Sequence, residues 1–146
     1  MKKILLAFGL IFLFFTAWYY WRNPPTAKVK IRDQIFWVEV AVTPKERERG
    51  LSGRETLAPN RGMLFIFASP GVYHFWMRGM QFPLDFIWIK ENRVVDISKN
   101  IPPPRNSEPQ MEVAPSEPVD KVLEVNAGTV GKLQIQVGDQ VEYSTN

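Results

Sequence analysis

The sequence contains no cysteine and only one histidine, His74. The absence of cysteine excludes disulfide bonds, thiolate metal ligands and a cysteine nucleophile. A single histidine without cysteine also excludes the usual zinc site built from these two residue types. No Walker or dinucleotide-binding pattern is present, because the glycines fall at expected turns. We therefore expect neither a metal nor a cofactor.

Outside its N-terminal segment, the chain also lacks an excess of basic over acidic residues or of acidic over basic ones. It has 146 residues, of which 18 are basic and 15 are acidic. Three of the basic residues, Lys2, Lys3 and Arg22, flank an uncharged stretch, so the remaining basic residues equal the acidic ones in number. The pI of about 9.3 therefore reflects that flank, and we expect no nucleic-acid partner.

The N-terminal segment is a long hydrophobic run. Residues 4–21 carry no charge and as a helix would be about 27 Å long, close to the bilayer core of about 30 Å. Four aromatic residues at 18–21 suit the membrane interface. A signal-peptide cleavage site is poorly formed, because bulky residues flank Ala17. We predict a membrane anchor or uncleaved signal over 1–22 and a domain outside the cytoplasm; a cleaved signal would make it secreted.

Beyond a linker at 23–27, residues 28–146 predict one β domain. Thr43, Pro44 and Glu46 form a capping-box pattern for a short helix that ends near residue 53, and a helical turn is expected over 126–133. Apolar periodicity predicts the strands 28–32, 35–42, 63–67, 72–77, 84–90, 93–100, 119–125 and 140–144. We expect a mainly β fold: a compact antiparallel sandwich or half-open barrel with one or two short helices, preceded by the N-terminal hydrophobic helix.

One segment interrupts this pattern. Residues 101–118 contain six prolines and little that can pack. A connector of this length is expected to be a surface loop, although a polyproline ligand for a partner domain is the alternative.

Asp85 is the central candidate for a site. It lies within the apolar stretch 83–89, where a charge must find a partner or be neutralised. A basic or donor-rich partner should therefore lie nearby, and Arg54 and Arg78 are the candidates. The pair would either brace the packing of helix on sheet or form the polar floor of a ligand pocket, and the sequence leaves both readings open.

His74 alternates along its predicted strand with Val72 and Trp76. A lone histidine beside aromatic residues is typically a packing residue, but it could act as a general base if Asp85 oriented its ring. Candidate nucleophiles for such a pair have no nucleophile-elbow motif around them. Trp76 and Trp88 could line a pocket or fill the core.

Several motifs, taken in order, resemble the domain-of-unknown-function 192 family over roughly residues 36–143. They are Arg49-Gly50-Leu51 with Arg54, Gly62–Phe67, Phe75–Arg78, Pro83–Asp85, Val122–Gly128 and Val137–Asp139. The resemblance implies a compact, mainly β sandwich or half-barrel domain, in a family whose members often look exported or lipid-tethered. It implies no agreed activity. The residues that match the family's suspected pocket are Arg54, Trp76, Arg78, Asp85 and Asn126.

The chain departs from the family pattern in two places. Gly79-Met80 stands where members often have an asparagine-threonine pair, and the proline-rich connector lacks the cysteines that some members carry. Any polar or redox role attached to those positions is therefore not expected here.

These patterns lead to three hypotheses of function. The first is a non-enzymatic, membrane-anchored domain that binds a small ligand or a membrane-protein partner. Its candidate ligand-binding residues are Arg54, His74, Trp76, Arg78, Asp85 and Asn126. The second is a hydrolase or isomerase that uses an Asp85–His74 acid–base pair. The third is a structural subunit of a membrane complex, docked through its anchor and its proline-rich connector.

Overall fold

A computed structural model describes residues 26–104 and 112–145. The predicted N-terminal helix over 1–22 lies outside these residues. The helices are α2 (Pro44–Arg49) and α3 (Thr129–Leu133). The strands are β1 (Thr26–Ile31), β2 (Gln34–Ala41), β3 (Arg61–Gly71), β4 (Phe75–Trp76), β5 (Leu84–Lys90), β6 (Arg93–Ile101), β7 (Glu112–Val113), β8 (Val119–Asn126) and β9 (Val141–Thr145).

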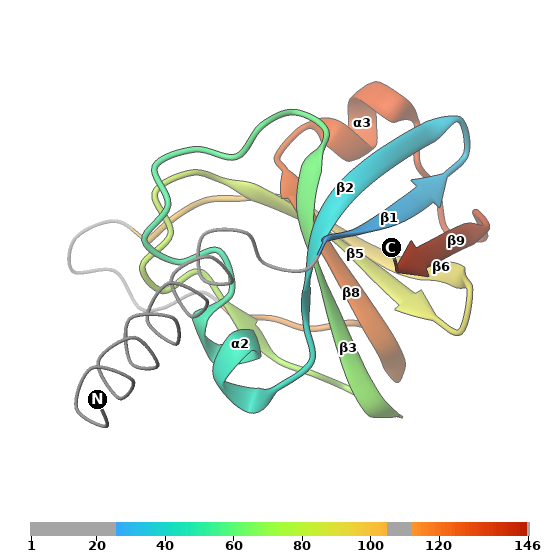
Figure 1. The fold of residues 1–146 in the computed structure, drawn as a ribbon, viewed down its shortest axis with the longest axis horizontal. Helices are drawn as coiled ribbons and strands as arrows, with labels where there is room; N and C mark the ends of the chain where they lie inside the picture. Colours follow the sequence, from blue (N-terminus) through green and yellow to red (C-terminus); the bar gives the residue numbers. More distant parts are fainter. Residues whose placement is uncertain (1–25, 105–111, 146) are drawn as a thin grey trace, which may run out of the picture.

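Seven strands form one sheet in the order β6-β5-β8-β3-β2-β1-β9, and β4 pairs with β7 in a separate ribbon. The large sheet curls so that its two edge strands approach each other (Figure 1). Arg93 forms an antiparallel bridge with Gln140, and the backbone N–H of Val141 donates to the carbonyl of Asn92 at 2.8 Å. The predicted mainly β half-barrel with two short helices is therefore confirmed for the described residues.

The expectation of a purely antiparallel sheet is wrong at one pair. β2 and β3 run parallel, with Trp37 opposite Arg61 and Ala41 opposite Phe65. Parallel neighbours need a crossover connection, which residues 42–60 provide and which contains α2. This crossover places α2 beside β3, where the pocket described below is formed.

Two predicted boundaries also differ from the structure. β3 continues to Gly71 instead of turning at residue 68, and the predicted strand 72–77 shortens to β4. The proline-rich segment is not wholly unstructured, because β7 within it pairs with β4. Residues 105–111 of that segment lie outside the described part.

The start of α2 follows the sequence pattern. The Thr43 hydroxyl accepts the Glu46 backbone N–H at 3.2 Å, and the Glu46 carboxylate accepts the Thr43 backbone N–H at 2.9 Å. These reciprocal bonds form the predicted capping box. Hydrogen bonds from the backbone of Thr43 and Val42 lower the pKa of Glu46, because they stabilise its charged form.

Alternation along the strands divides the core into two clusters. Leu64, Leu123 and Val125 pack with Val130 of α3 in one cluster. The second contains Phe65, Phe86, Trp88 and Val122 together with Leu51, just after α2. Figure 1 shows α2 and α3 far apart, each beside a different part of the sheet. Trp88 is fully buried, so it fills the core.

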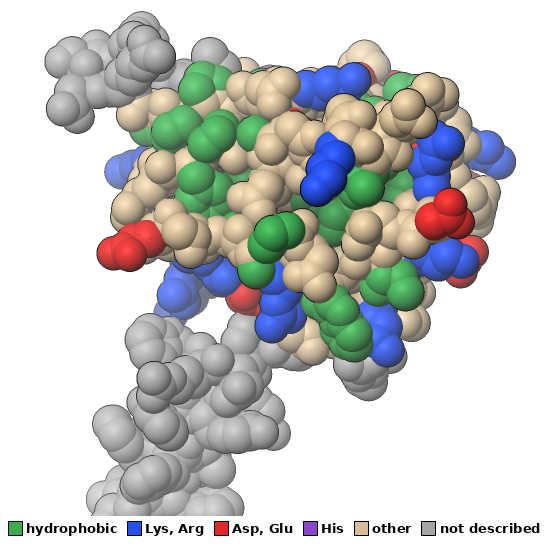
Figure 2. Space-filling view, turned by 90° about the horizontal axis from the view of Figure 1, so that it is seen from above, with side chains coloured by type: hydrophobic (Ala, Val, Ile, Leu, Met, Phe, Trp, Pro, Cys, Tyr) green, Lys and Arg blue, Asp and Glu red, His purple; other side chains and the backbone are tan. Residues whose placement is uncertain are grey.

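The surface carries both hydrophobic and charged side chains. On the face seen in Figure 2, basic groups are spread out rather than gathered in one patch, and hydrophobic side chains lie between them. Among residues 26–104 and 112–145, no helix is both long enough and apolar enough to cross a bilayer.

Candidate functional site

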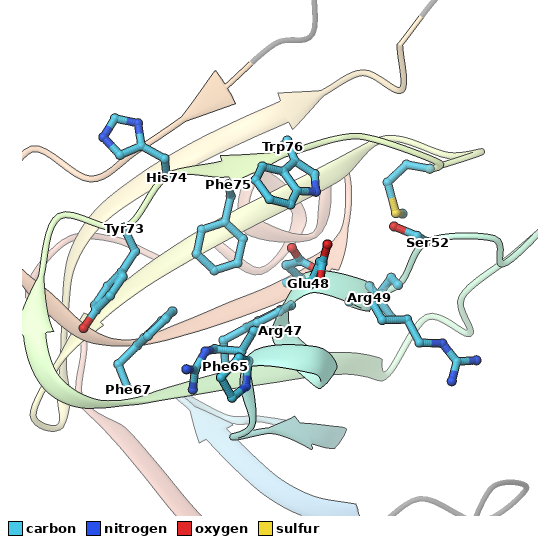
Figure 3. Close-up of a pocket in the computed structure, with 15 residues that line it drawn as sticks. Arg47, Glu48, Arg49, Ser52, Phe65, Phe67, Tyr73, His74, Phe75 and Trp76 are labelled. Atoms are coloured by element: carbon cyan, nitrogen blue, oxygen red, sulfur yellow. The ribbon is translucent and has the colours of Figure 1, made fainter.

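A pocket of about 330 Å³ opens between α2 and the segment that carries β4 (Figure 3). We call it the aromatic pocket. Its lining residues are Pro44, Arg47–Ser52, Phe65, Phe67, Tyr73–Trp76, Met80 and Glu124. Its volume falls at the lower end of the range for small-molecule sites.

Aromatic rings from two adjacent segments make one wall of the pocket. Alternation along β3 puts Phe65 and Phe67 on the same face, and residues 73–76 fold back over them. The Phe65 and Phe75 rings meet edge to face at 4.9 Å between centroids, whereas Phe67 and Tyr73 stack at 3.5 Å. Figure 3 shows Tyr73 and Phe75 pointing toward Phe67 and Phe65. The mutual packing holds these rings in place without a ligand.

Helix α2 supplies the opposite wall. Arg47 donates to the carbonyl of Ile66 at 3.1 Å and to that of Val42. Its guanidinium also lies 5.0 Å from the centroid of the Phe67 ring, which is a cation–π geometry. Arg47 therefore fixes the helix to the aromatic wall, while Glu48 and Arg49 are exposed beside the pocket.

A buried carboxyl group, that of Glu124, also lines the aromatic pocket. Glu124 lies on β8, opposite Met63 of β3 and Phe86 of β5, and is only 5% exposed. Burial among these apolar neighbours raises its pKa to about 8, although the charge of Arg54 opposes the shift. The group is therefore mainly protonated at neutral pH.

Arg54 pairs with Glu39 in a two-pronged ion pair. Its two terminal nitrogens lie 2.6 and 2.7 Å from the two carboxylate oxygens of Glu39. This hydrogen bonding raises the pKa of Arg54. Glu39 faces Met63 across the β2–β3 ladder, and Met63 in turn faces Glu124, so the pair lies near the buried acid.

Asp85 has the donor-rich partners expected of a buried carboxylate, but the candidate arginines Arg54 and Arg78 do not supply them. The side chain is fully buried. One carboxylate oxygen accepts the backbone N–H of Asn100 at 2.7 Å, and the other accepts that of Val130 at 2.9 Å. Val130 lies in the first turn of α3, where unsatisfied N–H groups and the helix dipole favour a negative charge. Backbone amides thus replace the expected cation.

The structure does not bring Asp85 and His74 together as an acid–base pair. Asp85 alternates on β5 with Phe86, whose ring packs against Phe75, so Asp85 lies on the face away from that cluster. His74 is exposed and its Nδ1 lies 3.5 Å from Glu112. In Figure 3 the ring of His74 points away from the pocket.

The other predicted residues are distributed over three places. Trp76 lines the aromatic pocket and is 42% exposed, and His74 lies at its edge. Arg78 is exposed and lines a second hollow that also includes Trp76. Asn126 donates to the carbonyl of Leu57 at 2.8 Å and lines a different hollow near α3. A ligand role for each of these residues stays a prediction.

Sequence reasoning missed Glu124, although its signal was present. The residue stands alone among the apolar residues Val122, Leu123 and Val125, as Asp85 does in its own strand. The two acids differ in their surroundings: backbone amides satisfy Asp85, whereas Glu124 lines a cavity. Only the fold makes that distinction.

The chain matches the model of one protein family over most of its length. The model of the DUF192 family, described as "Uncharacterized ACR", matches residues 27–143. The chain belongs to this family. A search of curated proteins gives no match.

Two solved structures resemble this DUF192 chain closely. A proposed transcription regulator from Sinorhizobium meliloti 1021 has 35% sequence identity and a TM-score of 0.70, and the match covers 82% of this chain and 92% of that one. A protein of unknown function from Novosphingobium aromaticivorans DSM 12444 has 33% identity and a TM-score of 0.69, over 80% of this chain and 83% of that one. The match thus spans nearly all of the S. meliloti chain.

Proposed function

We propose that this DUF192 domain is a non-enzymatic binding protein for a small molecule, and that the ligand occupies the aromatic pocket. The observation that carries the proposal is a cavity of about 330 Å³ with aromatic walls and a buried carboxyl group in its lining. Binding sites typically combine such a mainly apolar lining with a few placed polar groups. Asp85 and His74 have other partners, which supports binding over the alternative of a hydrolase or isomerase built on that couple.

The size of the cavity limits the ligand to one or two rings or a short aliphatic group. Trp76 offers an exposed aromatic side chain at the rim, whereas Phe65 is buried. An entering ring would therefore contact Trp76 first and then the inner aromatic residues. The rigid packing around Phe75 lowers the entropic cost of binding, because few side chains need to reorder.

NMR spectroscopy tests the proposal on residues 26–146. A library of one- and two-ring fragments is added at millimolar concentration, and the backbone amide signals are followed. We expect shifts to concentrate at residues 47–52 and 73–76. We expect Trp76→Ala to weaken the best fragment by about five- to twentyfold, as loss of an aromatic contact of about 1–2 kcal/mol implies.

Trp37→Ala is the matched control, because Trp37 lies on β2 and is not among the pocket residues. It should leave fragment affinity unchanged. A screen in which no fragment moves the pocket signals, or in which both tryptophan variants weaken binding equally, would overturn the proposal.

We also propose that residues 4–21 anchor the domain to a membrane, on its side away from the cytoplasm. The uncharged run of 18 residues supports this proposal. Alkaline extraction of membranes should leave the full chain in the pellet and release a variant that lacks residues 1–22. Release of both would contradict the anchor.

A further inference from the structure

Glu124 occupies an unusual electrostatic position. Its carboxyl group lines the aromatic pocket but is almost completely withdrawn from water. Its cross-strand neighbours are Met63 and Phe86, which offer neither charge nor hydrogen bonds. Among the described residues no hydrogen bond to this carboxyl group is found. An acid in such a place is costly to ionise unless a cation comes to it.

The basic residue whose charge acts on Glu124, Arg54, is already neutralised. Both terminal nitrogens of Arg54 bind the carboxylate of Glu39. The Arg54–Glu39 pair has no net charge, so an ionised Glu124 would leave this cluster with one uncompensated negative charge. The other basic side chain of the inner wall, Arg47, donates to the carbonyls of Val42 and Ile66, and among the described residues none forms a salt bridge with Glu124.

The walls of the pocket also suit a cation. Faces of aromatic rings carry partial negative charge and attract ammonium and guanidinium groups. The structure contains one such contact at the pocket itself, between the Arg47 guanidinium and the Phe67 ring. Tyr73, Phe75 and Trp76 provide further rings around the same cavity.

We propose that the ligand of the aromatic pocket is an organic cation, a protonated amine on a ring or short apolar body, whose nitrogen forms an ion pair with Glu124. This inference rests on the proposed binding function and specifies the ligand class. When the ammonium group binds, it keeps its proton, and the carboxyl proton of Glu124 passes to solvent. Rings of the wall hold the apolar body and shield the new ion pair from water.

Three indole derivatives that differ in charge test this proposal: tryptamine as the cation, tryptophol as the neutral form and indole-3-acetate as the anion. Calorimetric titration of residues 26–146 at pH 7 should give at least a tenfold higher affinity for tryptamine than for the other two. The Glu124→Gln variant, which keeps the shape but removes the charge, should bind tryptamine and tryptophol equally.

Proton release provides a readout that needs no variant. Titration in two buffers with different ionisation enthalpies should show nearly one proton released for each tryptamine bound at pH 7. Tryptamine affinity should rise as pH increases from 6 to 8, by up to tenfold per unit, and then level off. This follows because below about pH 8 the Glu124 carboxyl group must first lose its proton.

Two control variants sharpen the result. Glu142→Gln removes an exposed carboxylate on β9, far along the chain from the pocket residues, and should leave the preference for tryptamine intact. If Glu48→Gln abolished the preference and Glu124→Gln did not, the cation would lie at the rim and the inference would be wrong.

The experiment separates failure of this inference from failure of the binding function. Equal affinity for the three indoles, with binding weakened in Trp76→Ala, would overturn the proposal of a cationic ligand but leave the pocket as a binding site. Absence of tryptamine binding would also overturn the proposal of a cationic ligand. The binding function itself falls only if the fragment screen also finds no ligand at the pocket.

Discussion

At the scale of the residue, two buried acids on adjacent strands show how surroundings decide chemical role. Asp85 and Glu124 are both withdrawn from water. Asp85 receives a backbone N–H on each carboxylate oxygen, so its charge is satisfied within the fold. Glu124 faces a cavity instead. The first residue therefore organises the structure, and the second is available to a ligand.

The structural role of Asp85 predicts a clear loss in Asp85→Asn. The new amide can accept only one of the two backbone N–H groups, and its NH₂ group is directed against the other donor. We expect the free energy of unfolding to fall by about 1–3 kcal/mol, the cost of an unsatisfied buried group, as measured by urea denaturation. The amide proton of Asn100 or Val130 should also exchange faster with solvent.

Asp33→Asn serves as the control, because Asp33 is exposed in the turn between β1 and β2. It should change stability little. If Asp85→Asn were as stable as the original chain, the capping role assigned to Asp85 would be incorrect.

At the scale of the element, the pocket depends on how closely β3 and β8 approach. A Cβ atom added at Gly62 would lie 2.6 Å from the backbone oxygen of Glu124, which is closer than atoms can pack. The glycine therefore sets the spacing at the point where β8 presents its acid to the cavity. The parallel crossover that carries α2 then closes the other side of the pocket.

Gly62→Ala tests this close approach. The added methyl group must push β3 and β8 apart, and we expect a loss of about 1–3 kcal/mol in the free energy of unfolding. Gly131→Ala is a matched control in α3, because nothing lies within 4 Å of its added Cβ. That variant should be neutral or more stable by up to about 1 kcal/mol. Equal losses in both would contradict the packing argument.

At the scale of the whole molecule, Glu124 links the stability of the fold to pH. Its folded pKa of about 8 lies above the ordinary value of 4.5. Between these values the folded chain retains a proton that the unfolded chain has lost. Rising pH therefore favours the unfolded state across this window, and the contribution becomes constant above about pH 8.

The Glu124→Gln variant should escape this dependence. Its free energy of unfolding, measured in urea at pH 5.5, 7.0 and 8.5, should increase relative to that of the original chain as pH rises. The difference should grow by at most about 1.4 kcal/mol per pH unit. Parallel profiles for the two proteins would show that Glu124 ionises normally in the folded state.

The sequence by itself determined the local features of this protein. Strand periodicity and the capping box at Thr43 depend on neighbouring residues only, and the family motifs keep their order along the chain. It also marked Asp85 as buried, because no polar residue adjoins it in the chain.

The tertiary structure decided which residues meet. The partner of Asp85, the pairing of Arg54 with Glu39 and the place of Glu124 beside the pocket are contacts between distant segments. They depend on the parallel crossover of α2 and on the register of β8 between β3 and β5. A one-residue shift of that register would turn Glu124 to the opposite face of the sheet. Local pattern carries no such information, since many pairings satisfy the same alternation.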